Sequence, residues 1–216
     1  MKVGTDGVLL GAWGRVEGRC ILDIGTGTGL VALMAAQRNP SATVLGVDID
    51  AKAVGQAREN IAESPFRERV SCALQNILTF SSTQRFDAIL CNPPFFTEDT
   101  LPDDTGRALA RNNRSLPFPQ LIKKVASLLT SEGTFSVIIP CGLAREFISL
   151  CLAENLHLSR RCFVRTTPQK PPRRTLMTFV VGQSSVVNEQ SLCLSEADGS
   201  RSKAYKELTE AFYLDA

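Results

Sequence analysis

The stretch CILDIGTGTGL, residues 20–30, decides the fold. Residues 20–24 have the character of a buried strand, and they run into Gly25, Gly27 and Gly29. A helical pattern follows at 30–37, with its apolar residues on one face. A glycine-rich turn between a strand and a helix is where open α/β sheets bind ligands, because glycine lets the backbone turn sharply and a ligand approach closely. The segment therefore predicts an α/β protein with a ligand site after its first strand.

Strand and helix patterns alternate through the following residues, which predicts βαβ units and a parallel sheet. We expect strands at 43–49, 70–74, 86–91 and 134–139, and helices at 51–63, 116–129 and 143–155. Residues 158–164 and 176–181 form two further expected strands. Their connection is too short for a crossover helix, so they should pair as an antiparallel hairpin. A mostly parallel, seven-stranded sheet that ends in such a hairpin is the shape of the class I methyltransferase fold, which is Rossmann-like.

Composition limits the possible classes of protein. The chain has 216 residues, 44% of them hydrophobic, which fits a single globular domain over 1–216. Its net charge is only +2, so bulk charge does not indicate a nucleic-acid partner. Seven cysteines without CxxC spacing and a single histidine predict reduced, buried thiols and no metal site. No signal peptide or membrane-length apolar stretch is present, so we expect a cytoplasmic protein that does not contact membranes.

Asp48 lies near the end of the second expected strand, about 20 positions beyond the glycine turn, where a carboxylate can accept hydrogen bonds from ribose hydroxyls. Ile49 should lie against an adenine face, and Asp50 should cap the helix at 51–63. A dinucleotide fingerprint would need a glycine where Leu30 stands. The sequence therefore disfavours a nicotinamide oxidoreductase.

The glycine turn and Asp48 resemble motif I and the following acidic strand of class I S-adenosylmethionine methyltransferases. The resemblance implies that the turn packs against the methionine part of the cofactor and that Asp48 holds its ribose. The family often has an Asp after the third strand that binds the adenine amino group. Asn76 stands there in this chain, and its amide oxygen can accept the same bond. The expected cofactor-binding residues are Gly4, Thr5, Asp6, Asp23, Gly25, Gly27, Gly29, Asp48, Ile49, Asn76, Ile77 and Asn92.

The stretch FDAILCNPPFF, residues 86–96, is the most informative about chemistry. Pro93 and Pro94 remove two backbone donors, so the carbonyls near them remain as acceptors. Asn92 adds a side-chain acceptor, and Phe95 supplies a flat face. An exocyclic amine such as adenine N6 is a double donor on a flat ring, which two acceptors and an aromatic side chain suit. We expect Asn92, Pro93, Pro94 and Phe95 to form the catalytic loop, acting mainly by orienting the amine.

This segment resembles the NPP-aromatic motif of amino methyltransferases, which act on adenine N6 in DNA or RNA, guanine N2 in ribosomal RNA, or a protein glutamine. Four further stretches narrow the resemblance to bacterial tRNA(Val) adenine-N6-methyltransferases of the YfiC type, across essentially the whole chain. They are KVGTDGVLLGAW at 2–13, ARNNRSL at 110–116, KPPRR at 170–174 and YKELTEAFYL at 205–214. Members normally have residues before the first stretch that contribute to a cofactor lid, so we expect the lid segment to be incomplete here.

Charge along the chain agrees with an RNA substrate. Residues 155–188 contain no Asp or Glu but six Arg or Lys, a plausible edge for phosphate contacts. The expected RNA-binding residues are Arg111, Arg114, Lys170, Arg173 and Arg174. The alternative is that these are ordinary strand-edge charges. We expect a monomer that methylates an adenine beside the anticodon of a valine tRNA. Guanine-N2 or glutamine-N5 methylation, and a non-enzymatic binding module, remain open alternatives.

Overall fold

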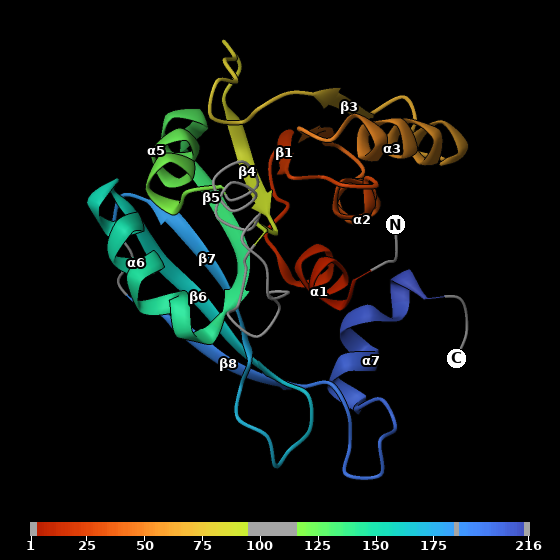
Figure 1. Cartoon of the computed structure of the whole chain (residues 1–216), viewed down its shortest axis with the longest axis vertical. Coiled ribbons are helices and arrows are strands. Elements are labelled where there is room, and N and C mark those ends of the chain that lie inside the picture. The colour runs from red at the N-terminus through yellow and green to blue at the C-terminus, as the bar shows by residue number, and fades with distance from the viewer. Residues whose placement is uncertain (1–3, 95–115, 184–185, 214–216) are drawn as a thin grey trace, which may run out of the picture.

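A computed structural model describes residues 4–94, 116–183 and 186–213. Within them, eight strands form one sheet in the order β3-β2-β1-β4-β5-β7-β6-β8 (Figure 1). The strands are β1 (Cys20–Ile24), β2 (Thr43–Asp48), β3 (Val70–Leu74), β4 (Phe86–Cys91), β5 (Leu129–Pro140), β6 (Leu156–Arg165), β7 (Arg174–Val181) and β8 (Asn188–Cys193). The α-helices are α1 (Thr5–Trp13), α2 (Leu30–Arg38), α3 (Ala51–Glu63), α5 (Phe118–Leu128), α6 (Ala144–Ala153) and α7 (Lys203–Thr209).

The pairing of the strands confirms the predicted α/β class. Strands β3, β2, β1, β4 and β5 run parallel to one another, and β7 pairs antiparallel with both β5 and β6. The sheet has one strand more than the predicted seven, because β8 pairs parallel with β6. Four of the six residues of β8 are exposed. A strand on the outer edge of a sheet needs no apolar alternation, so its sequence gives no strand pattern.

Helices cover both faces of the sheet and divide the apolar core in two. Helices α1, α2 and α3 lie on one side in Figure 1, and α5 and α6 lie on the other. Neighbouring strand residues point to opposite sides, so Leu90 packs with the α1 and α2 side while Ile89 packs with α5 and α6. Buried Phe135, Phe147 and Phe179 fill the α5 and α6 side. The central strands are thus fixed from both faces.

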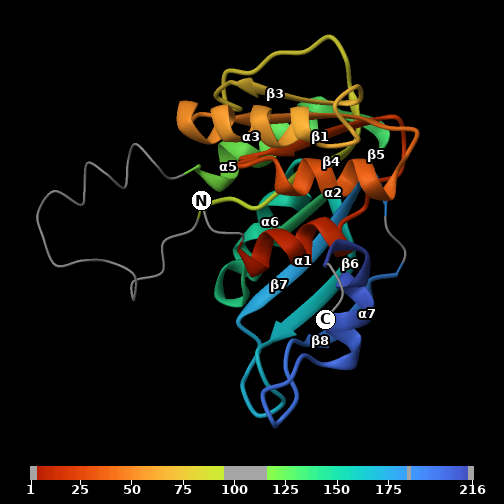
Figure 2. The same ribbon diagram turned by 90° about the vertical axis from the view of Figure 1, so that its right-hand side faces the viewer.

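Helix α1 was not predicted from sequence periodicity. Every residue from Gly7 to Trp13 is buried, since the helix lies among the sheet, α2 and α7 (Figure 2). Gly11 allows a close approach to α2: a Cβ at this position would lie 2.5 Å from Met34 Sδ. A helix that is apolar on every side lacks the one-sided pattern by which amphipathic helices are recognised.

The carboxyl edge of the sheet collects the segments that bear on function. The parallel strands β1, β2 and β4 all end there, and so does β5. Pro140, the last residue of β5, pairs with Arg174, which in turn pairs with Val164 of β6. The turn between β6 and β7, residues 166–173, therefore lies at the same edge as the glycine turn.

Candidate active site

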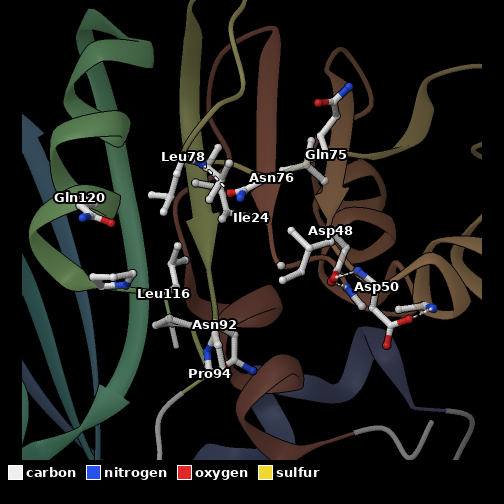
Figure 3. Close-up of a pocket in the computed structure, with 18 of the residues that line it drawn as sticks. Ile24, Asp48, Asp50, Gln75, Asn76, Leu78, Asn92, Pro94, Leu116 and Gln120 are labelled. Atoms are coloured by element: carbon white, nitrogen blue, oxygen red, sulfur yellow. Dashed lines mark hydrogen bonds between the residues drawn. The ribbon is translucent and has the colours of Figure 1, made fainter. Parts of the chain in front are cut away.

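A cavity of about 750 Å³ opens at this carboxyl edge. Asn92 and Pro94 lie at one end of it in Figure 3, with Asp48 and Asp50 along one side and Gln120 along the other. The cavity is lined by Asp6, Ile24, Gly25, Gly27, Val47, Asp48, Ile49, Asp50, Ala53, Gln75, Asn76, Ile77, Leu78, Asn92, Pro93, Pro94, Leu116, Pro117 and Gln120. Its volume is typical of a site for a small organic molecule.

The glycine turn forms the floor of this cavity. Gly25 and Gly27 line it with φ angles of +70° and +57°, a left-handed conformation that favours glycine. The backbone N–H groups of Gly25 and Thr26 donate to Val47 O at 2.9 and 3.1 Å, which ties the turn to β2. Gly29 is not among the described residues that line the cavity. It starts α2, and a Cβ there would lie 3.4 Å from Ala57 of α3, so its place in the fold is helix packing.

Asp23 lies beneath the glycine turn and is not among the described cavity-lining residues, in contrast to the predicted cofactor contact. It is 1% exposed, and its Oδ2 accepts a hydrogen bond from Thr26 Oγ1 at 2.6 Å. Burial raises the pKa of Asp23 to about 7, and the nearby charge of Asp48 raises it further, while the Thr26 hydroxyl opposes the shift. Asp23 is therefore placed to support the turn.

The end of β2 supplies the acidic side of the cavity. The two oxygens of Asp48 accept hydrogen bonds from Gly27 N and Asp50 N, both at 2.9 Å (Figure 3). This fixes the carboxylate between the glycine turn and the start of α3. Asp50 caps α3 as predicted, accepting from Lys52 N at 2.9 Å. Ile49 is 61% exposed although apolar, and it lies at the cavity, where a flat apolar ligand would cover it.

The loop after β3 borders the cavity next to Ile49. Asn76 Oδ1 accepts a hydrogen bond from Leu78 N at 3.0 Å, so the oxygen predicted to bind adenine already has one donor and retains one lone pair. Ile77 is buried against the other lining residues. Gln120, in the first turns of α5, faces them from across the cavity (Figure 3). Sequence reasoning missed Gln120, because no local pattern marks a helix residue that reaches a site built on other strands.

The predicted catalytic residues begin where β4 ends. Asn92, Pro93 and Pro94 all line the cavity. The Asn92 carbonyl lies 4.0 Å from the position that a Cβ on Gly25 would take, so the two segments approach closely. In the part of the chain that the structure describes, no hydrogen bond reaches the Asn92 side chain. Phe95, the fourth predicted member, lies outside the described residues.

The N-terminal stretch contributes one predicted residue to the cavity. Asp6 lines it from the first turn of α1, and its Oδ2 lies 2.9 Å from Nε of Arg174. Gly4 and Thr5 are exposed and are not among the described lining residues. The structure thus places Asp6, but not its two predecessors, at the cavity.

The arginine and lysine side chains of the predicted basic edge form two groups that differ in their contacts. Arg160 stacks on the Trp13 ring at 4.2 Å, and Arg161 stacks on Phe163 at the same distance, so these two stabilise the fold around β6. Lys170 and Arg173 are exposed on the β6–β7 turn. Arg111 and Arg114 lie outside the described residues.

The sequence predicts that the seven cysteines are reduced and buried and that the chain holds no metal site. All seven thiols are free; Cys91, Cys151 and Cys162 are buried, whereas the other four are half-buried. Burial raises the pKa of Cys162 to about 11, which keeps this thiol protonated at neutral pH. The described ranges contain no group of three His, Cys, Asp or Glu side chains placed to hold a metal ion, and no helix in them is long and apolar enough to cross a membrane.

Comparisons with known proteins agree with this arrangement. Residues 4–154 match the family model of the methyltransferase small domain. The chain is 45% identical to the tRNA1(Val) (adenine(37)-N6)-methyltransferase of Bacteroides thetaiotaomicron, over 99% of this chain and 91% of that one. It is 41% identical to the protein of the same name from Pseudoalteromonas translucida, over 99% and 92%.

Solved structures resemble the fold. A protein of Agrobacterium tumefaciens named as a predicted O-methyltransferase superposes with a TM-score of 0.74 at 18% identity, covering 98% of this chain and 99% of that one. The ribosomal protein L11 methylase of Lactobacillus delbrueckii superposes with a TM-score of 0.58 at 17% identity, covering 82% and 77%. At these identities the likeness concerns the fold alone.

The sheet order, the glycine turn and the family match define a class I S-adenosylmethionine-dependent methyltransferase. At 40–45% identity over nearly its full length, the chain belongs to the tRNA1(Val) (adenine(37)-N6)-methyltransferase family. The cavity suits the cofactor of this class. It offers a carboxylate for ribose hydroxyls, an exposed apolar side chain for adenine, and a glycine floor without side chains at the level of Asn92.

Proposed function

We propose that this protein methylates the N6 atom of adenine 37, next to the anticodon, in a valine tRNA. The observation that carries the proposal is the position of Asn92. It lies in the same cavity as the glycine turn and Asp48, at the end where the proline pair leaves acceptor groups. The names of the relatives that align over nearly the whole chain point to the same substrate.

Asn92 and the adjoining backbone carbonyls act on the target amine. An exocyclic amine has two N–H donors, and two acceptors that engage both of them direct the nitrogen lone pair toward the cofactor. When bound, S-adenosylmethionine would supply an electrophilic methyl group: the bond to N6 would form as the C–S bond breaks, S-adenosylhomocysteine would leave, and the proton lost from N6 would pass to solvent. The residues therefore have to orient the amine and exclude competing geometries, and orientation of this kind can supply several kcal/mol of the barrier reduction.

Asp48 and Ile49 act on the cofactor. The Asp48 carboxylate is held rigidly by two backbone N–H groups, so it can accept from ribose hydroxyls without reorganising. Ile49 offers an apolar surface beside it for the adenine ring. An adenine next to an anticodon is unpaired, so extruding it toward Asn92 costs little.

The test is methyl transfer from labelled S-adenosylmethionine to an unmodified valine tRNA, followed by nucleoside mass spectrometry. N6-methyladenosine should form, and a tRNA carrying guanine at position 37 should remain unlabelled. Ribosomal RNA and release factor serve as parallel substrates. Label in guanine N2 or in a protein glutamine, with none in the tRNA, would contradict the proposal and favour one of the alternative amine substrates.

We further propose that residues 1–216 act as one monomeric, cytoplasmic methyltransferase domain. The support is the continuous sheet, in which the C-terminal strands extend the parallel part. Light scattering of the purified chain at micromolar concentration should give the mass of a single 23.5 kDa chain. A mass of twice that value would contradict the monomer.

A further inference from the structure

The ion pair between Asp6 and Arg174 joins two parts of the chain that are 168 residues apart in sequence. Arg174 Nε lies 2.9 Å from Asp6 Oδ2, a distance typical of a charge-assisted hydrogen bond. The two side chains are only 30% and 27% exposed, so solvent screens this pair less than it screens surface pairs.

The two residues of this ion pair belong to different elements of the fold. Arg174 is the first residue of β7, where it pairs with Pro140 of β5 and Val164 of β6, so its backbone is fixed in the sheet. Asp6 belongs to the first turn of α1 and lines the cofactor cavity. The next residue, Gly7, packs beside Leu30, which directly follows the glycine turn.

Arg174 therefore differs from its neighbours on the basic turn. Lys170 and Arg173 are exposed, and a phosphate can reach them from solvent. The Arg174 guanidinium is instead directed toward a cavity-lining carboxylate. The N-cap residue Gly4 makes no side-chain hydrogen bond to the first turn of α1, so the Asp6–Arg174 pair is a contact that ties this turn to the sheet.

We propose that Arg174 is a positioning residue of the cofactor cavity, which holds Asp6 and with it the first turn of α1 against the cavity wall. This role differs from the expectation that Arg174 contacts RNA phosphates, which stays a prediction. It rests on the proposed cofactor role of the cavity, but it does not depend on which RNA is the substrate.

Calorimetry with S-adenosylhomocysteine, in the absence of RNA, tests the proposal. Arg174→Gln should weaken binding about 5–10-fold, the size expected for a partly exposed charged contact. Arg173→Gln is the matched control, because it removes the same charge one residue earlier, and it should bind the ligand as the wild type does. Arg174→Lys keeps a cation in reach of Asp6 and should restore part of the affinity.

A double-mutant cycle separates positioning from general damage. Asp6→Asn should weaken binding at least as much as Arg174→Gln, and the double variant should be no weaker than Asp6→Asn alone, because Arg174 acts through Asp6. Cofactor affinity that is unchanged in Arg174→Gln, or fully additive losses in the double variant, would overturn the proposal. If Arg174→Gln does not fold, Arg174→Lys against Asp6→Asn gives the same comparison. A wild type that fails to bind S-adenosylhomocysteine would instead contradict the proposed function.

Discussion

Asn92 is the residue on which the proposed chemistry depends most directly, because it lies at the end of β4 inside the cavity. Asn92→Ala should lower kcat by about 10²–10³, the typical effect of removing a preorganised polar contact to the transition state. Cofactor affinity should persist, since the glycine turn and Asp48 remain. Single-turnover methylation of an anticodon stem-loop at saturating cofactor measures the loss. Asn92→Asp should keep some activity, because a carboxylate can still accept, and wild-type turnover by Asn92→Ala would remove Asn92 from the mechanism.

Phe95 belongs to the same predicted loop but lies outside the described residues. Phe95→Ala should raise KM and lower kcat together, because stacking on a base is worth about 1–3 kcal/mol. Phe95→Tyr keeps the ring and should stay active in the same assay. Equal losses in both variants would indicate that the ring does not stack on the target base.

Asp48 carries a prediction about the cofactor rather than the amine. Asp48→Ala should weaken S-adenosylmethionine binding by about 1.5–3 kcal/mol through a lost charged hydrogen bond. The same change also removes the acceptor of Gly27 N and Asp50 N, so it should loosen the glycine turn. Calorimetry measures the affinity, and a thermal melt checks that the variant folds. Unchanged affinity in a folded variant would exclude Asp48 from the cofactor site.

The sequence was sufficient to predict those candidate site residues that lie at the end of a single strand. Asp48 ends β2, while Asn76 and Asn92 follow β3 and β4, and such positions meet at one edge of a parallel sheet. The sequence could not show which residues of the glycine turn line the cavity and which only support the turn by packing. Asp23 and Gly29 occur within the motif, yet one is buried under the turn and the other packs on α3. That distinction depends on which way each group points after packing.

At the scale of elements, the β6–β7 turn carries the prediction for RNA. Lys170→Ala with Arg173→Ala should weaken tRNA binding and lower its salt dependence, because each lost phosphate contact reduces the slope by about 0.7–0.9. Cofactor affinity should not change. The pair Arg173→Ala and Arg174→Ala would not isolate this effect, since Arg174 contacts Asp6 of the cavity. Filter binding across a salt series measures the slope, and an unchanged slope would contradict the assignment of the turn.

Most of the elements could be read from the sequence, and the exceptions share a physical cause. A helix with one buried face, such as α3, has clear periodicity, and β1, which is buried on both faces, is a short run of mostly apolar residues. Helix α1 is buried on all sides and β8 is exposed along most of its length, so neither has a one-sided pattern. Their positions are set by tertiary contacts with β6, α2 and α7, and those contacts join residues far apart in the chain.

For the whole molecule, Asp23 makes stability depend on pH. Its pKa is raised to about 7 in the fold, from an ordinary value of 3.8. Between these values the native state keeps a proton that the unfolded chain has released, so the free energy of unfolding should fall as pH rises from about 4 to 7. Below pH 4 the residue is protonated in both states, and above 7 the penalty is constant. The shift corresponds to a few kcal/mol.

Asp23→Asn tests this dependence, because an amide mimics the protonated acid. Its Nδ2 can donate to the Thr26 hydroxyl, and it cannot ionise. Urea unfolding at pH 5 and pH 8 should show a smaller loss of stability for the variant than for the wild type. If the free energy of unfolding changed by the same amount between pH 5 and pH 8 in both proteins, the burial of a neutral Asp23 would be contradicted.

The two ends of the described chain meet on one side of the sheet. Val8 and Ala12 of α1 share an apolar cluster with Leu208, Phe212 and Tyr213. The helix that presents Asp6 to the cavity thus packs against residues near the other end of the described chain. During translation, this side of α1 therefore stays uncovered until residues 208–213 have been made. The same proximity makes a circular permutant, in which a short linker joins the two ends of the described chain, a form that the fold can accommodate.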